Sequence, residues 1–232
     1  MSIVTAIYLT VFFLSILNIV LLVEMGFRPN VYCILLMCAM VISNGGYLAI
    51  SVSETVDAAI IGNCLVYLGG CYAPLFVFFI GLDLTKIRIP KLVSLLMFIY
   101  TTVVVFFTFT IGRLPIYYKS IDIERVNGYT VLVKEYGPLH NLYLIMLVFL
   151  TIASTFVCVV AFKRRYLVSY KTTIIFSAFL VVNVCVYILD RLFKIDIEWN
   201  CITFLITEII VLFLYGRMNM YDMTYNISRA WE

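Results

Sequence analysis

Long uninterrupted apolar segments constrain this chain more than any other feature of its sequence. Each has about the twenty residues that an α-helix needs to cross the ~30 Å hydrocarbon core of a bilayer. In the whole chain 64% of the residues are apolar and 12% are charged, far from the roughly 45–50% apolar content of soluble domains. The sequence therefore predicts an all-α integral membrane protein, a bundle of seven transmembrane helices at residues 3–23, 31–52, 57–81, 92–112, 138–161, 171–190 and 197–215.

The distribution of Lys and Arg predicts how the bundle is oriented. Ten of the sixteen lie at one set of helix ends, which includes the C-terminal tail, and six lie at the opposite set. Because cytoplasmic connections carry the excess of positive charge, we expect the N-terminus outside and the C-terminus in the cytoplasm. We expect the chain to cross the plasma membrane several times.

One sizeable loop, between the fourth and fifth spans, lies on the predicted outer side. Its sequence YYKSIDIERVNGYTVLVKEYG has two β-prone stretches around Asn127-Gly128. Asn-Gly is a dipeptide that favours a two-residue hairpin turn. We therefore expect a small extracellular β-hairpin between the fourth and fifth helices.

Polar residues inside the spans are the first candidates for a binding site, because ionisable groups are costly in a membrane. Glu208 lies about 15 Å below the outer end of the seventh span at 1.5 Å per residue, and no Lys or Arg lies at that depth in any span. Asn44, Asn63 and Asn183 fall at comparable depths on three other spans. Two interpretations stay open: these four line one water-accessible pocket, or they form a hydrogen-bonded cluster that holds the helices together.

A second group of candidates lies at the predicted outer rim. It comprises His140, Tyr143, Glu198 and Trp199, which we expect to contribute to ligand binding. His140 is the single histidine of the chain, and its position at a helix start also fits a capping or interfacial role. One histidine cannot form a metal site by itself, and we predict neither a metal nor a cofactor.

A proline inside the third span marks a candidate conformational element. Pro74 follows the pair Gly69-Gly70, and prolines and small residues are where transmembrane helices bend. We expect Pro74, Gly69 and Gly70 to allow a small rearrangement of the bundle.

Other functional classes find no support in the sequence. Metalloprotease, hydrolase and nucleotide-binding motifs are absent, and the predicted cytoplasmic loops are too short for a catalytic domain, so we expect no enzyme in this chain. The net charge of +3 comes without a basic cluster, which argues against nucleic acid.

The residues after the last span predict a helix that continues into the cytoplasm. Apolar or small residues follow gaps of three and four, as in the seam of a short coiled coil, at Phe213, Gly216, Met220, Met223, Ile227 and Ala230. We therefore divide the chain into a seven-helix domain, residues 1–216, and a juxtamembrane signalling helix, residues 217–232. The seam predicts a homodimer.

Two segments and this tail resemble a known family. The run YLGGCYAPLFVFFIGLDLTKIRIPK joins Tyr67 and Gly69 to Pro74 and a basic turn, and KEYGPLHNLYLIMLVFL opens the fifth span. Over residues 10–225 the chain is similar to the N-terminal seven-transmembrane sensor region of bacterial histidine kinases and diguanylate cyclases. The resemblance implies a cytoplasmic PAS, GGDEF or kinase module after the bundle, and we expect the output domain to lie outside these 232 residues.

The sequence thus predicts a membrane sensory module. We expect it to detect an extracellular or membrane-borne small ligand and to act through its C-terminal helix on an output domain, in cis or in trans. The alternative is a small-solute permease or channel with a polar site at the midplane. The odd number of spans argues against it, because seven helices do not divide into two repeats.

The predicted orientation can be tested with single cysteines in a variant without the seven native ones. Ser120→Cys, in the outer loop, should react with an impermeant thiol reagent in intact cells, whereas Ser228→Cys, in the tail, should react only after lysis. The reverse pattern would show that the charge bias does not set the orientation.

Overall fold

The computed structural model describes residues 2–25, 30–163, 170–192 and 198–230. It contains seven α-helices and one antiparallel β-hairpin in these residues. The elements in chain order are α1 (Ile3–Glu24), α2 (Val31–Val52), α3 (Val56–Leu84), α4 (Lys91–Thr108), β1 (Tyr118–Val126), β2 (Tyr129–Tyr136), α5 (His140–Lys163), α6 (Tyr170–Leu192) and α7 (Trp199–Ala230). The seven-helix bundle and the hairpin are both confirmed.

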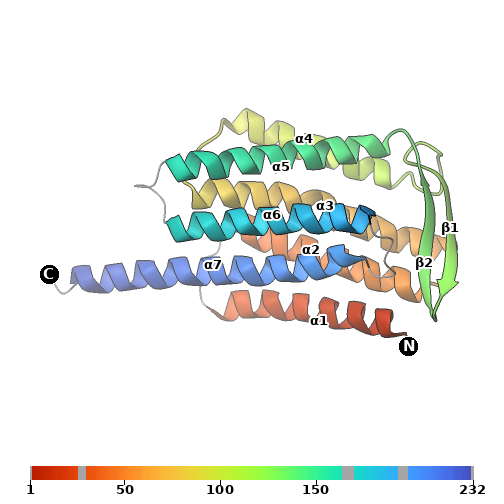
Figure 1. Cartoon of the computed structure of the whole chain (residues 1–232), viewed down its shortest axis with the longest axis horizontal. Helices are drawn as coiled ribbons and strands as arrows, with labels where there is room; N and C mark the ends of the chain where they lie inside the picture. Colours follow the sequence, from red (N-terminus) through yellow and green to blue (C-terminus); the bar gives the residue numbers. More distant parts are fainter. Residues whose placement is uncertain (1, 26–29, 164–169, 193–197, 231–232) are drawn as a thin grey trace.

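The helices run side by side along the long axis of the molecule (Figure 1). The N-terminus and the hairpin lie at one end of the bundle, and α7 projects beyond the other helices at the opposite end. This places the two chain ends on opposite sides, as an odd number of spans requires. Which end faces the outside stays a prediction from the charge bias, and we call the hairpin end the outer end below.

Several helix bounds differ from those expected. Helix α3 contains Pro74, as expected, and ends at Leu84 rather than at 81. The proline removes one backbone hydrogen bond, and the neighbouring turns are retained. Helix α4 ends at Thr108 rather than at 112, and the chain then forms tight turns that include Gly112 at φ +76°. The expected span at 197–215 and the expected tail helix form one helix, α7, which begins at Trp199 and reaches Ala230 without a break.

Length and hydropathy suit these helices to a membrane. Within the described residues, α1 to α5 and the Trp199–Gly216 part of α7 are long and apolar enough to span a bilayer, and α6 has a shorter apolar stretch, Ile174–Val186. Large apolar side chains such as Phe13, Phe106 and Phe156 are exposed on the outside of the bundle. In water this surface would be unfavourable, but against lipid it costs nothing.

The hairpin has the turn that its sequence predicts. Asn127 and Gly128 both have positive φ, 48° and 81°, which a two-residue type I′ turn requires, and Val126 pairs with Tyr129. The Thr130 hydroxyl donates a 2.6 Å hydrogen bond to the carbonyl oxygen of Ser53, at the outer end of α2. The hairpin is therefore tied to the bundle and lies across its outer end (Figure 1).

Glycines set the close approach of α2 and α3. A Cβ atom at Gly69 would clash with the carbonyl oxygen of Ala39 and lie 2.6 Å from Cβ of Ser43. At the next position, a Cβ on Gly70 would meet only the Tyr143 hydroxyl, 3.9 Å away. The two glycines thus have different roles, because only Gly69 is needed for helix packing.

These neighbours provide a matched test of the packing. Gly69→Ala should lower the free energy of unfolding by about 1–3 kcal/mol, as overpacking does. Gly70→Ala should leave it unchanged or raise it by up to about 1 kcal/mol, since alanine favours a helix. Unfolding of both variants in detergent micelles, followed by tryptophan fluorescence, measures the difference. Equal stabilities would show that α2 and α3 separate easily.

Candidate functional site

A cavity of about 620 Å³ lies inside the outer half of the bundle. Helices α3, α5 and α7 and strand β2, at the outer end, form most of its wall, and α2, α6 and Tyr8 of α1 complete it. On α7 the lining residues extend from Glu198, just before the helix, to Thr207, about 14 Å at 1.5 Å per residue. The volume falls within the roughly 300–1,000 Å³ of small-molecule sites.

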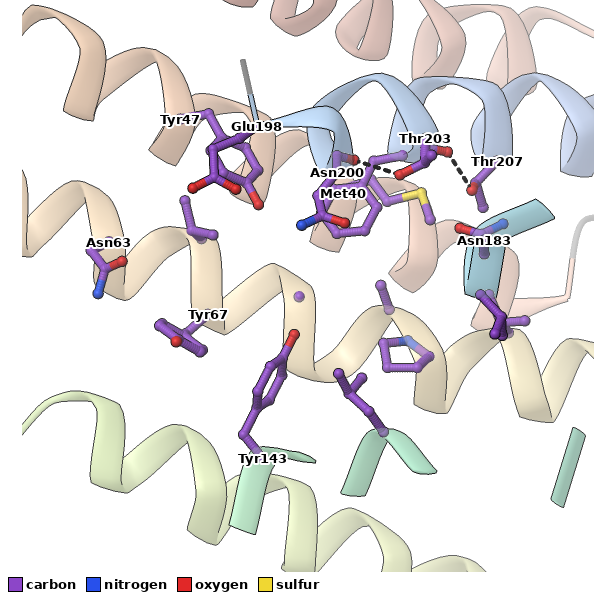
Figure 2. Close-up of a pocket in the computed structure, with 18 of the residues that line it drawn as sticks. Met40, Tyr47, Asn63, Tyr67, Tyr143, Asn183, Glu198, Asn200, Thr203 and Thr207 are labelled. Atoms are coloured by element: carbon purple, nitrogen blue, oxygen red, sulfur yellow. Dashed lines mark hydrogen bonds between the residues drawn. The ribbon is translucent and has the colours of Figure 1, made fainter. Parts of the chain in front are cut away.

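The outer part of this cavity is polar. Glu198 and Tyr47 lie beside each other at one edge, and Asn63 and Tyr67 of α3 lie across from them (Figure 2). Tyr143 of α5 points toward the same space. A carboxylate, an amide and three phenol hydroxyls can thus orient the polar part of a ligand.

The deeper part is mainly apolar. Val77, Leu147, Leu180 and Phe204 line it. Two threonines of α7 also line it, but both hydroxyls donate to carbonyl oxygens of their own helix: Thr203 to Asn200 at 2.9 Å and Thr207 to Thr203 at 2.6 Å. Asn183 of α6 is the amide at this depth (Figure 2).

Behind the outer part lies a buried aromatic network around His140. The Tyr67 hydroxyl is 3.2 Å from Nε2 of His140 and accepts a 2.8 Å hydrogen bond from the hydroxyl of Tyr118. The Asn63 amide in turn donates to the Tyr118 hydroxyl at 3.4 Å. Burial raises the pKa of the Tyr118 phenol, so this hydroxyl keeps its proton and remains a donor. His140 is buried beneath the hairpin and does not line the cavity.

Glu208 lies apart from the cavity, in a polar cluster between α1, α2 and α7. Its Oε2 accepts a 3.0 Å hydrogen bond from the Asn18 amide, and the Asn44 amide donates to the Ser15 hydroxyl at 2.8 Å. Ser15 also interacts with Glu208. The Glu208 side chain is fully buried, at 0% exposure. Two oxygens of this cluster, Glu208 Oε1 and Asn44 Oδ1, have no hydrogen-bond donor in the described protein.

The sequence candidates therefore lie in several different places. Asn63, Asn183, Tyr143 and Glu198 line the cavity together with Gly70 and Pro74. Glu208 and Asn44 belong to the polar cluster, and His140 belongs to the aromatic network. Trp199 is exposed and Gly69 packs between α2 and α3. Of the two interpretations left open for Glu208, Asn44, Asn63 and Asn183, neither applies to all four, because α7 turns Thr207 toward the cavity and Glu208 toward α1. The contribution of any of these residues to ligand binding stays a prediction.

Sequence reasoning missed the partners that α1 supplies. Tyr8 accepts a 3.0 Å hydrogen bond from the backbone N–H of Glu198, so the outer end of α7 lies level with Tyr8, and not with the start of α1. Asn18 is as far along α1 from Tyr8 as Glu208 is along α7 from Glu198, which brings the two side chains together. The Ser15 and Asn18 pair, three residues apart in an apolar span, was the available signal.

Metal binding finds no cluster to support it. No group of three or more His, Cys, Asp and Glu side chains lies close enough to hold a metal ion among the residues described in the structure. All seven cysteines are free thiols.

The contact between Asn18 and Glu208 can be measured by a double-mutant cycle. Glu208→Leu should lower the free energy of unfolding by about 1–3 kcal/mol, because it leaves the buried Asn18 amide without an acceptor. Adding Asn18→Leu should recover part of the loss, since both partners are then apolar, and Glu208→Gln should remain close to the parent. Equilibrium unfolding in mixed micelles of the parent, each single leucine variant, the double variant and Glu208→Gln gives the five values. Strictly additive losses would show that the two side chains are not coupled.

Comparison with known proteins identifies the family. Residues 5–224 match the family described as the N-terminal 7TM region of histidine kinase. No curated protein and no solved structure matches the chain. The match covers nearly all of the 232 residues, and its seven transmembrane helices agree with the helix count of the described structure. The chain belongs to the family of N-terminal seven-transmembrane regions of histidine kinases, a multi-pass membrane sensor region.

Proposed function

We propose that this bundle binds a small ligand in its outer cavity and transmits that binding through α7 to a cytoplasmic output domain. In keeping with the family, the output is a histidine kinase, with a diguanylate cyclase as the alternative noted from the sequence. The bundle would reside in the plasma membrane of a bacterium, with the hairpin outside.

One observation carries this proposal: the same helix lines the cavity and leaves the membrane. Asn200, Thr203 and Thr207 of α7 line the cavity, and α7 continues to Ala230 without interruption. Figure 1 shows it projecting beyond the other six helices on the side opposite the hairpin. A rigid helix can carry a rotation or a shift of its outer half to whatever is attached at its inner end.

A ligand changes the output only if it binds two arrangements of the bundle unequally. Helix α7 has a ligand-facing side at Thr203 and Thr207 and a side fixed to α1 at Glu208. Filling the cavity would push on the first side, and the Asn18–Glu208 contact would act as the pivot.

Dimerisation through the tail is part of the proposal. The seam positions from Met220 onward lie where no side chain is described, so the homodimer rests on the sequence pattern. In a dimer, rotation of two parallel α7 helices would change how two attached domains face each other.

The phase of α7 provides the test. In a fusion of residues 1–232 to a kinase catalytic domain, one alanine inserted after Gly216 turns everything beyond it by about 100°. We expect basal autophosphorylation in membranes to change by roughly fivefold or more, the scale of typical coupling between sites. A seven-residue insertion differs from two full turns by only about 20° and should restore the parent activity.

Equal autophosphorylation in the parent and in both insertion variants would contradict transmission through a rigid α7. The permease alternative makes the opposite pair of predictions: insertions after Gly216 should have no effect, and the purified bundle should support solute flux into proteoliposomes. Protein-free liposomes are the control for flux.

A further inference from the structure

We propose that the ligand of the cavity is a single-chain amphiphile with an amine-bearing head, which reaches the cavity sideways from the outer leaflet between α5 and α6. This rests on the proposed function only in taking the cavity as the ligand site. Three features of the cavity support it: its division into a polar and an apolar end, the placement of Glu198, and its opening to the lipid-facing surface.

The polar and apolar ends are ordered along the membrane normal. Glu198, Tyr47 and Asn63 lie at the outer end (Figure 2), at the level of the hairpin and therefore of the lipid headgroups. Val77, Leu147 and Phe204 line most of the part that reaches into the bundle, with Asn183 among them. A hydrocarbon chain would bury apolar surface along these side chains. The volume of about 620 Å³ suits a ligand of small-molecule size.

Glu198 determines the chemistry of the head. Its carboxylate belongs to the residue at the outer start of α7 and lies beside the Tyr47 ring (Figure 2). Lys134 of β2 lines the same end from the hairpin side and lies near the Tyr118 phenol. An ammonium or another charged donor at the α7 side would form a charge-assisted hydrogen bond with Glu198, roughly twice as strong as a neutral one.

The lateral opening follows from residues that belong both to the cavity and to the outer surface. Val148 and Ile152 of α5 line the cavity, yet they are 58% and 64% exposed on the outside of the bundle. Leu180 and Val184 of the neighbouring α6 line the cavity as well. In a membrane, what covers this exposed surface is lipid, so the cavity is continuous with the hydrocarbon layer.

The way α6 packs explains why the opening exists. Near its inner end, α6 contacts α3 through Phe176, whose Cζ lies 2.8 Å from where a Cβ on Gly81 would be. From Leu180 outward, residues of α6 line the cavity instead. Helix α6 is thus held to α3 at the inner end and separated from it farther out, which leaves a gap beside α5.

The test uses the full chain in vesicles of phosphatidylcholine and phosphatidylglycerol, with dodecylamine carrying a diazirine at the chain end as the probe. Photolabelling should saturate, and mass spectrometry should find the label on α5, α6 and α7. Ile152→Trp should reduce saturable labelling by about fivefold or more, because the indole overfills the opening. Ile145→Trp is the matched control: this isoleucine is on the same helix and 57% exposed, but does not line the cavity, so labelling should not change.

The charge of the ligand's head group is tested by competition. Glu198→Gln should weaken competition by unlabelled dodecylamine by about fivefold, the loss of one charge-assisted contact, and leave competition by dodecanol unchanged. Glu54→Gln, on an exposed outer carboxylate that faces Arg125 at 4.0 Å, is the control and should have no effect. Stronger competition by dodecanoate than by dodecylamine would overturn the amine head.

Two further outcomes test the lateral entry and the hydrocarbon chain of the ligand. Equal labelling of Ile152→Trp and Ile145→Trp, or equal competition by ethylamine and dodecylamine, would overturn the lateral, chain-bearing ligand. If Ile152→Trp does not fold, as judged by size-exclusion chromatography, Val148→Trp against the exposed, non-lining Val159→Trp takes its place.

Failure of this inference differs from failure of the proposed function. Saturable labelling that is lost in Ile152→Trp would support the amphiphile as the ligand of the cavity. If dodecylamine then does not change the activity of the fused kinase, the proposed sensing function is contradicted and the ligand assignment is kept. The opposite result is kinase activity that depends on the phase of α7 together with no saturable labelling. It would support transmission through α7 and overturn the amphiphile.

Discussion

The hydrogen bond between Asn18 and Glu208 is the contact on which the rest of the bundle depends. A carboxyl group at the centre of a membrane helix costs at least ~2.5 kcal/mol when unsatisfied, and Asn18 offsets part of that cost at 3.0 Å. Helices α1 and α7 run parallel, and Tyr8 accepts a hydrogen bond from the backbone of Glu198 at their outer ends. This contact and the Asn18–Glu208 contact are about 15 Å apart. Together they fix the position of α7 along α1 and its rotation about its own axis. The first and last helices of the chain are thereby joined.

This fixed rotation gives α7 two different sides. Thr207 lines the cavity while Glu208, the next residue, faces α1 and α2. The glycine contacts that hold α2 closely against α3 make those two helices a rigid support. Along the outer half of α6, the described side chains Leu180, Asn183 and Val184 line the cavity. The cavity therefore lies between this support and α6, an arrangement in which a small ligand can move one helix against others.

The fold was largely predictable from the sequence, and the site only in part. Apolar length predicts the helices, and Asn127-Gly128 predicts the hairpin, because both depend on local chemistry. Depth along each span grouped Glu208 with Asn63 and Asn183, yet it could not reveal that α7 starts level with Tyr8 or which way Glu208 turns. The height and the rotation of α7 depend on how helices far apart in sequence pack together. The buried position of His140 and its contact with Tyr67 depend on the same packing.

The aromatic network under the hairpin bears on how a ligand would enter the cavity. Tyr67, Tyr118 and His140 are buried and hydrogen-bonded to one another, and Thr130 fastens the hairpin to α2. Opening this end would expose several buried polar groups and break their hydrogen bonds, each worth about 0.5–1.5 kcal/mol. Moving α5 from α6 along Val148 and Ile152 exchanges apolar contacts for lipid at little cost. The proposed entry from the side, between α5 and α6, is therefore the path that disturbs fewer polar contacts.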